Sequence, residues 1–292
     1  MKTPILILLF LTSFTVQAQQ EEYTAFLEQA WESIGKKDEK GFNSNLKYFS
    51  VAVNRDKITP EILSKENLNL YTRCLYSALT NQFKLSNDLA QQAVLFLQYD
   101  IENYPDNYFS LGYLYDKGYG VSQDFDKAIY WYEKAINFRN SATAMNNIGN
   151  IYYMQKNYSQ AKYWFEKATL KGNGPGMHGL AYLYEYGYGV NQDINKAVEL
   201  YVNASNAGHV DAMFNLGLMY LNGKKVTANP TESRKWFKKA AEAGDVEAMV
   251  YLGQSFLNGD SVMQNQDEAR FWFNKSCQAG YQKGCDNLNS LK

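Results

Sequence analysis

A motif that recurs about every 36 residues most constrains the fold of this 292-residue chain. Each copy contains Leu-Gly or a close variant, and successive copies, from Leu111-Gly112 to Leu288-Asn289, are 37, 32, 36, 36 and 36 residues apart. In the first five copies an aromatic residue stands four positions after the Leu or Ile, which is the spacing of one face of an α-helix. The sequence therefore predicts one such helix, helix A, in every repeat.

A second helix, helix B, is predicted after each helix A. Small residues recur seven positions apart, as at Ala128 and Ala135 or Ala197 and Ala204, with large side chains between them. Small residues at this spacing let two helices approach closely, and the large side chains fill the space between repeats. The expected fold is all-α, a right-handed superhelix, or solenoid, of stacked antiparallel helix pairs.

Loop residues are expected to mark where the helices end and begin. Glycine accepts the left-handed conformation at a helix C-terminus, and it stands where helix A must end, at Gly118, Gly187, Gly223 and Gly259. Side chains that cap a helix N-terminus stand where helix B must begin, at Asp124, Asp193, Asn229 and Asn265. The Gly-x-Gly motifs are therefore interpreted as helix stops. A phosphate-binding loop would need a preceding strand and a third glycine, and the sequence shows neither.

These repeats resemble two related families. The segment AMFNLGLMYLNGKKVTANPTESRKWFKKAAEAG, Ala212 to Gly244, is similar to a Sel1-like repeat, as are copies that begin near Asn107, Gly176 and Ala248. The copy from Ala144 to Gly172 lacks four loop residues and is similar to a tetratricopeptide repeat. Both families consist of stacked helix pairs. The resemblance covers roughly the C-terminal two thirds of the chain.

The expected organisation has three parts. Residues 1–18 are a predicted signal peptide, and residues 19–106 form a helical cap that resembles a degenerate tetratricopeptide unit. The repeat array follows in residues 107–292, with repeats at about 107–140, 141–173, 174–209, 210–245 and 246–281 and a closing helix at 282–292.

The first residues indicate export. Lys2, an apolar run from Ile5 to Phe14 and the small pair Val16 and Ala18 form the pattern of a signal peptide cleaved after Ala18. An uncleaved membrane anchor is the alternative, although this run is shorter than the roughly 20 residues that span a bilayer. We expect a bacterial periplasmic or secreted protein with no membrane span after cleavage. The formal charge of -1, with Lys and Arg spread along the chain, argues against a nucleic-acid partner.

The three cysteines are few for a fold built on disulfides. Cysteine-rich Sel1-like proteins bridge consecutive helices at the eight-residue spacing of Cys277 and Cys285, so the resemblance implies a disulfide between these two residues. Two buried thiols are the alternative. Cys74 has no partner in the sequence and is expected to be a small buried side chain.

Patterns for catalysis are sparse, and neither a metal nor a cofactor is expected. His178 and His209 have no cysteine or acidic residue at metal-ligand spacing, and His209 is interpreted as a turn residue. Ser33-Ile-Gly-Lys36 matches the Ser-x-x-Lys of penicillin-recognising enzymes, but the companion motifs are absent. Some cysteine-rich Sel1-like proteins are described as penicillin-binding or weak β-lactamases. A hydrolase of cell-wall or β-lactam substrates is therefore the alternative function.

The A helices of a solenoid line a concave groove. In tetratricopeptide-type packing, the residues two before, two after and five after the Leu of Leu-Gly point into it. Here they are aromatic and amide-rich: Phe109, Tyr113, Asp116, Asn146, Asn150, Tyr153, His178, Tyr182, Glu185, Phe214, Leu218 and Leu221. Asn150 stands where the tetratricopeptide family often places a peptide-binding asparagine.

Amides can hydrogen-bond the backbone of an extended peptide, and rigid aromatic rings supply contact area at low entropy cost. Packing between repeats is the alternative role of these tyrosines. The leading hypothesis is a monomeric, non-catalytic adaptor that binds a protein or an extended peptide in the cell envelope. A secreted effector that binds a host protein would use the same chemistry.

Overall fold

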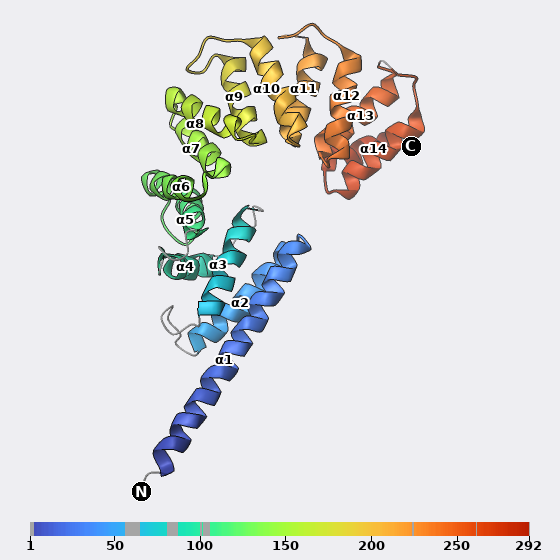
Figure 1. The fold of residues 1–292 in the computed structure, drawn as a ribbon. Coiled ribbons are helices and arrows are strands. Elements are labelled where there is room, and N and C mark those ends of the chain that lie inside the picture. The colour runs from blue at the N-terminus through green and yellow to red at the C-terminus, as the bar shows by residue number, and fades with distance from the viewer. Residues whose placement is uncertain are drawn as a thin grey trace. The chain divides into compact units, whose positions relative to one another are not determined.

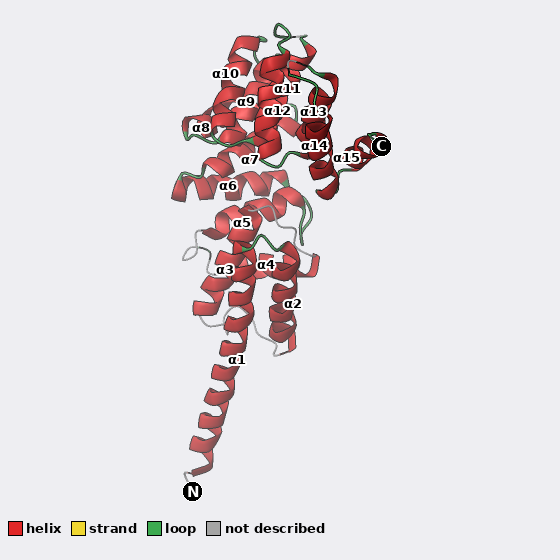
Figure 2. Ribbon diagram, turned by 90° about the vertical axis from the view of Figure 1, so that its right-hand side faces the viewer, coloured by secondary structure: helices red, strands yellow, loops and turns green. Residues whose placement is uncertain are grey.

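The structure is a computed structural model that describes residues 3–55, 65–80, 87–99, 101, 106–223, 225–260 and 262–291. All regular secondary structure in these residues is helical, in fifteen helices (Figures 1 and 2). This confirms the predicted all-α repeat fold. The chain forms two compact units, Met1–Ala144 and Met145–Lys292.

The first unit contains α1 (Thr3–Gly35), α2 (Glu39–Arg55), α3 (Lys65–Thr80), α4 (Asn87–Gln98), α5 (Asp106–Lys117) and α6 (Phe125–Arg139). Its core is aromatic, and the buried ring of Phe49 stacks on that of Tyr71 at 5.0 Å. Cys74 is fully buried, as predicted, and burial raises the pKa of its thiol to about 12. No helix in the described residues is both long and apolar enough to cross a membrane.

The second unit carries most of the repeat array. It comprises α7 (Ala142–Met154), which begins at the boundary, then α8 (Tyr158–Leu170), α9 (Gly174–Tyr186), α10 (Ile194–Asn206), α11 (Val210–Asn222), α12 (Pro230–Glu242), α13 (Val246–Asn258), α14 (Gln266–Gln278) and α15 (Gln282–Ser290). The odd-numbered members from α5 to α13 are A helices and the even-numbered ones are B helices. From α8 to α15 each helix packs against the next, and Figure 1 shows α9 to α14 side by side in chain order.

Glycine in the Leu-Gly motif lets the two helices of one repeat approach closely. A Cβ atom on Gly217 would lie 2.6 Å from the ring of Phe237, and one on Gly149 would lie 2.6 Å from the ring of Phe165. These rings are almost fully buried. The glycine and the helix-B aromatic therefore form one packing unit, which explains why both recur at the same spacing.

The loops follow the predicted chemistry. Gly187 ends α9 in the left-handed conformation at φ 73°, and the Asp193 side chain caps α10 by accepting a hydrogen bond from the backbone N-H of Lys196. The second glycine of this Gly-x-Gly has a separate role. A Cβ atom on Gly189 would lie 2.7 Å from the Cβ of Tyr158 at the start of α8. The motif thus ends one helix and packs its loop against the preceding repeat.

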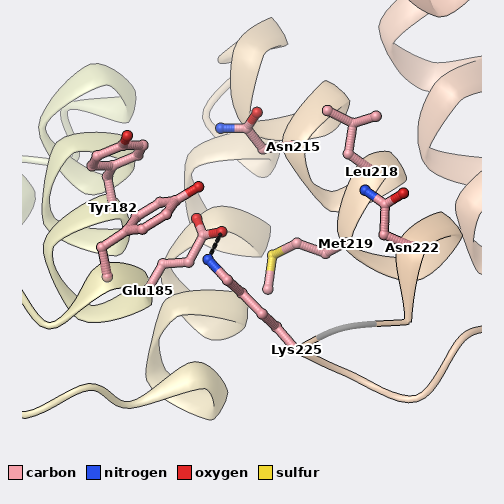
Figure 3. Close-up of a pocket in the computed structure, with 8 residues that line it drawn as sticks. Tyr182, Glu185, Asn215, Leu218, Met219, Asn222 and Lys225 are labelled. Carbon is pink, nitrogen blue, oxygen red and sulfur yellow. Dashed lines mark hydrogen bonds and ion pairs between the residues drawn. The ribbon is translucent and has the colours of Figure 1, made fainter.

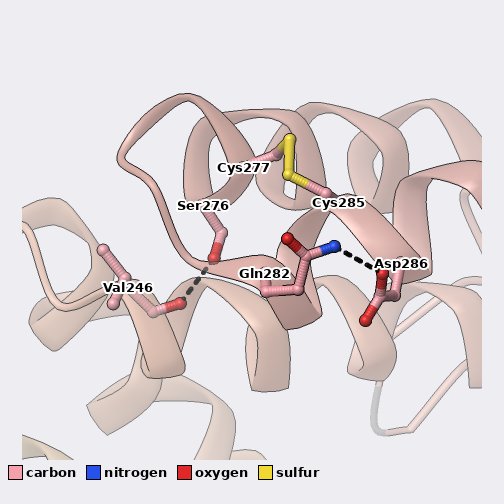
Figure 4. The surroundings of a disulfide bond; sticks show 6 residues. All are labelled: Val246, Ser276, Cys277, Gln282, Cys285 and Asp286. Carbon is pink, nitrogen blue, oxygen red and sulfur yellow. Dashed lines mark hydrogen bonds between the residues drawn. A yellow bond between two sulfur atoms is a disulfide. The ribbon is translucent and has the colours of Figure 1, made fainter.

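A disulfide between Cys277 and Cys285 joins α14 to the closing helix α15 (Figure 4). Beside it, the Ser276 hydroxyl donates a hydrogen bond of 2.8 Å to the backbone oxygen of Val246 at the start of α13. A terminal repeat has a neighbour on one side only. The disulfide therefore holds the closing helix against the last complete repeat, and the Ser276 hydrogen bond joins the two helices within that repeat.

Candidate functional site

Three of the predicted groove residues lie in the first unit. Phe109 is buried with its ring 5.6 Å from that of Tyr132. Asp116 is also buried, and its carboxylate lies 3.4 Å from the Tyr132 hydroxyl and 3.0 Å from the Lys117 ammonium. Only Tyr113 is partly exposed. In this unit two of the three side chains therefore pack within their own repeat.

In the second unit the predicted residues have different surroundings. Asn146 and Glu185 are buried, whereas Asn150 is exposed. Phe214 packs its ring against those of Phe237 and Tyr251, at 5.7 and 5.8 Å. Six of the predicted residues line two pockets that share Tyr182. One pocket contains Asn150, Tyr153, His178 and Tyr182. The other contains Tyr182, Glu185 and Leu218.

The first of these, the aromatic pocket, has a volume of about 300 Å³ and lies among α7, α8 and α9. It is lined by Asn150, Tyr153, Phe165, His178, Gly179 and Tyr182. The rings of Tyr153 and Tyr182 stand nearly perpendicular, at 85°, with centroids 5.9 Å apart. Burial, and then the neighbouring Tyr182, raise the pKa of Tyr153 to about 12. Its hydroxyl therefore stays protonated at neutral pH.

His178 connects this pocket to the next repeat. The amide nitrogen of Asn215 on α11 lies 2.9 Å from His178 Nε2, and because the amide is the donor, this ring nitrogen accepts. The His209 ring lies 4.8 Å away. Burial, followed by the charge of a protonated His209, lowers the pKa of His178 to about 4, and burial also lowers the pKa of His209. Both imidazoles are therefore neutral at pH 7.

The second pocket is called the charged pocket, and Figure 3 shows the side chains that line it. Its volume is about 270 Å³. Its lining comes from α9, α11 and the loop after α11: Tyr182, Glu185, Tyr186, Asn215, Leu218, Met219, Asn222 and Lys225. Lys225 Nζ lies 2.8 Å from Glu185 Oε1 and 3.6 Å from the centroid of the Tyr186 ring. The Lys225 ammonium thus contacts a carboxylate and an aromatic face together.

Glu185 is held firmly. The Tyr201 hydroxyl on α10 donates a hydrogen bond of 2.6 Å to Glu185 Oε2, and the Gln192 side chain donates one of 2.8 Å to the Glu185 backbone oxygen. Burial alone would lower the pKa of Lys225, but the hydrogen bond and the charge of Glu185 outweigh it and raise that pKa. Lys225 therefore stays protonated, with its ammonium directed at the buried carboxyl group of Glu185.

A pattern in the repeat sequences indicates where an acidic side chain is buried. Where the fifth residue after the motif Leu is acidic, as at Asp116 and Glu185, helix B supplies a tyrosine hydroxyl, from Tyr132 and Tyr201 respectively. Where that residue is not acidic, helix B has phenylalanine at the same place: Phe165, Phe237 and Phe273. Sequence reasoning missed this pairing, as well as Lys225, Tyr186, Asn215 and Asn222.

Five tyrosines form a continuous cluster around the two pockets: Tyr153, Tyr158, Tyr182, Tyr186 and Tyr188. The rings of Tyr158 and Tyr188 stack with centroids 4.9 Å apart and an interplanar angle of 12°. This contact packs the Gly-Tyr-Gly loop against α8. Tyr182 and Tyr186 lie 4.5 Å apart and both face the charged pocket. The cluster therefore packs between repeats, and three of its members, Tyr153, Tyr182 and Tyr186, also line the pockets.

The Ser-x-x-Lys segment shows no paired geometry. The Ser33 hydroxyl donates to the backbone oxygen of Gln29 at 3.0 Å, and Lys36 forms an exposed ion pair with Glu32 at 3.2 Å. His209 is the N-cap residue of α11, as expected for a turn position. In the described part of the chain, no three His, Cys, Asp or Glu side chains gather closely enough to hold a metal ion.

Stacked helix pairs with pockets between neighbouring A helices define a helical-repeat protein. The Sel1 repeat family matches residues 108–137, 174–209, 210–245 and 246–281, and the tetratricopeptide repeat matches residues 141–169. The chain is a Sel1-like repeat protein of the tetratricopeptide-like superfamily, with one tetratricopeptide repeat inside its array. This confirms the family resemblance.

Solved structures agree. A Sel1 repeat protein from Oxalobacter formigenes is 26% identical with a TM-score of 0.62, over 76% of this chain and 88% of that one. The c5321 protective antigen of uropathogenic Escherichia coli, which displays an SLR fold, is 21% identical with a TM-score of 0.54, over 94% and 64%. The immunity protein Pa5087 from Pseudomonas aeruginosa is 20% identical with a TM-score of 0.50, over 71% and 81%. The last two show likeness of fold alone. No curated protein matches the sequence.

Proposed function

We propose that this protein is an exported scaffold that binds an extended segment of a partner protein on the A helices α7, α9 and α11. One observation carries the proposal: the aromatic and charged pockets adjoin at Tyr182 on three consecutive A helices. Sel1 and tetratricopeptide arrays serve generally as protein-interaction scaffolds, which supports the same conclusion.

The chemistry of the lining suits a peptide backbone. An A-helix surface offers no strand edge, because its backbone groups are bonded within the helices, so a bound peptide must find its hydrogen bonds in side chains. Exposed amides stand at Asn150 beside the aromatic pocket and at Asn222 beside the charged pocket. Tyrosine rings supply rigid contact area around them.

A capture experiment tests the binding role. The chain from residue 19 to 292 is used as bait in bacterial envelope extract, beside an Asn150→Ala/Tyr182→Ala variant and a matched Tyr163→Ala/Phe271→Ala variant. Tyr163 and Phe271 are exposed aromatic residues on B helices, so this control also removes two large side chains, but from another surface.

The expected result is one partner that the parent chain and the B-helix variant retain and the A-helix variant loses. Isothermal titration with the purified partner then measures the loss, which should be at least tenfold in Kd. Equal retention by all three proteins would show that the A-helix surface is not the binding site.

Export rests on the predicted signal peptide, and the disulfide suits an oxidising compartment. Fractionation of cells that express the whole chain, with N-terminal sequencing, should give a periplasmic or secreted protein that begins at Gln19. A cytosolic product that still begins at Met1 would overturn this part of the proposal.

The proposal also includes a monomer without catalytic activity, since the site presents no nucleophile with a base in hydrogen-bond reach. Size-exclusion chromatography with light scattering should give a mass of about 31 kDa, the mass of one mature chain. Nitrocefin and muropeptide assays should show no turnover above buffer. Turnover in either assay would favour the hydrolase alternative.

A further inference from the structure

Two equivalent positions in the array carry very different residues at the contact with the preceding repeat. Gly179 and Tyr251 each lie immediately before the motif Leu and 14 residues after the helix-B aromatic, which is Phe165 for one and Phe237 for the other. The Tyr251 ring stacks on the Phe237 ring at 4.7 Å and 6°. Gly179 has no side chain, and Gly179 and Phe165 both line the aromatic pocket.

The absence of a side chain at Gly179 also shapes the floor of this pocket. A Cβ atom there would lie 2.7 Å from the Phe165 ring, so α9 approaches that ring more closely than any other residue would allow. The walls are the perpendicular rings of Tyr153 and Tyr182. A volume of about 300 Å³ stands at the lower end of ligand sites, which suits one large side chain.

The lining selects an uncharged occupant. No acidic or basic side chain other than the imidazole lines the aromatic pocket. Burial lowers the pKa of His178 to about 4 and raises that of Tyr153 to about 12, so both are neutral at pH 7. A charged side chain that entered would lose hydration and gain no counter-charge. An aromatic ring would gain edge and face contacts with two tyrosines.

We propose, resting on the proposed function, that the partner segment inserts one phenylalanine or tyrosine side chain into the aromatic pocket, where its ring takes the place that Tyr251 takes two repeats later. The protein thus fills this position with its own ring in the fifth repeat and leaves it for a partner's ring in the third. Aromatic pairing predicts a preference of about two- to tenfold for phenylalanine over leucine.

Single-residue probes test this pocket without the partner. The mature chain is titrated with N-acetyl-phenylalaninamide, N-acetyl-leucinamide, N-acetyl-argininamide and methyl β-glucoside, with binding followed by ligand-observed NMR. We expect a Kd on the order of 1 mM for the phenylalanine probe, about two- to tenfold weaker binding of the leucine probe, and no binding of the other two. Leucine binding as tight as phenylalanine, or binding of arginine or the glycoside instead, would overturn the proposal.

Three variants locate the binding. Gly179→Tyr fills the pocket, and Tyr182→Ala removes one wall without requiring new space, so at least one can be tested as a folded protein. Both should weaken the phenylalanine probe at least fivefold. Tyr251→Ala is the matched control, because it removes a ring at the equivalent position of another repeat, and it should leave the Kd unchanged. A loss in Tyr251→Ala equal to that in Tyr182→Ala would refute the assignment.

Failure of this inference is distinguishable from failure of the proposed function. If partner capture depends on Asn150 and Tyr182 but the aromatic probes do not bind, the scaffold role stands and the aromatic anchor is wrong. If the aromatic probes bind but no partner is captured through this surface, the pocket assignment stands and the scaffold role is wrong.

Discussion

Acid is predicted to destabilise the second unit through His178, which lies between the third and fourth repeats. Its Nε2 accepts a hydrogen bond from Asn215, and its ring contacts those of His209 and Tyr201. The acidic side chains that act on it are Glu185 of α9 and Asp211 of α11, and both favour the protonated ring. Burial outweighs them, so the pKa of His178 falls from 6.5 to about 4.

Proton linkage gives the sign and the size of the change in stability with pH. Between pH 6.5 and pH 4 the unfolded chain binds a proton at His178 that the folded chain does not, so stability falls as the pH is lowered through this range. The full difference of about 2.5 pKa units corresponds to about 3 kcal/mol, reached below pH 4, and about 1.4 kcal/mol is lost by pH 5.5. The pKa of His209 is also lowered by burial, so its contribution has the same sign.

Urea unfolding at pH 7.0 and pH 5.5, followed by circular dichroism, measures this effect. His178→Gln stays neutral at both pH values and keeps an acceptor for Asn215, and carboxylate titrations common to both proteins cancel in the comparison. Part of the loss is already present at pH 7.0, so between the two pH values the parent should lose about 1.2 kcal/mol more than the variant, with the same dependence on urea in both. Equal losses in the two proteins would refute a lowered His178 pKa.

Three further changes test other parts of the structure. Tyr201→Phe removes the hydroxyl that donates to buried Glu185 and should cost about 1.5 to 3 kcal/mol in urea unfolding; a cost below about 0.5 kcal/mol would contradict a strong hydrogen bond to a charged group. Cys285→Ser opens the eight-residue disulfide loop and should lower the free energy of unfolding by about 2.5 kcal/mol. Reduction of the parent with dithiothreitol should have the same effect. An unchanged melting temperature in both cases would show that the disulfide does not stabilise the protein. Gly189→Ala should lower the free energy of unfolding by about 2 to 3 kcal/mol, because φ is 66° and the new methyl group would collide with α8. Gly172→Ala is the control: φ is 73° but the space around it is open, so the loss should be about 1 kcal/mol. Equal losses would refute the packing role of Gly189.

The helix pairs and their ends could be predicted from sequence because local chemistry determines them. Asn229 and Pro230 show why: the Asn229 side chain accepts from the Glu232 N-H and Pro230 occupies the first turn of α12, as a capping side chain and a proline at this place dictate. Such signals lie within four residues of each other. The disulfide could be expected as well, but only through the family resemblance.

The pairing of side chains across repeats could not be predicted in the same way. Lys225 reaches Glu185 across 40 residues, and His178 meets His209 across 31. Each contact depends on how far neighbouring helix pairs are rotated and shifted, and helical periodicity within one repeat does not determine either quantity. The rule of two, two and five residues around the motif Leu gave no indication that Asp116 and Glu185 are buried, because each of them lies against a tyrosine hydroxyl that helix B provides.

Departures from the repeat pattern coincide with the candidate site. The repeat that contains α7 and α8 lacks four loop residues. The next has a glycine, Gly179, at the position before the motif Leu, where the other repeats have a side chain: Ser110, Asn147, Asn215 and Tyr251. The one after has Lys225 at the place of Gly189. Gly179 lines the aromatic pocket and Lys225 the charged pocket, and the short repeat contributes Asn150 and Tyr153. In a stacked array, residues that fit the common pattern are used in packing each repeat against the next, so a surface specific to one partner must come from positions that break the pattern. Three consecutive breaks around α7 to α11 are therefore a stronger indication of a binding site than any residue that all repeats share.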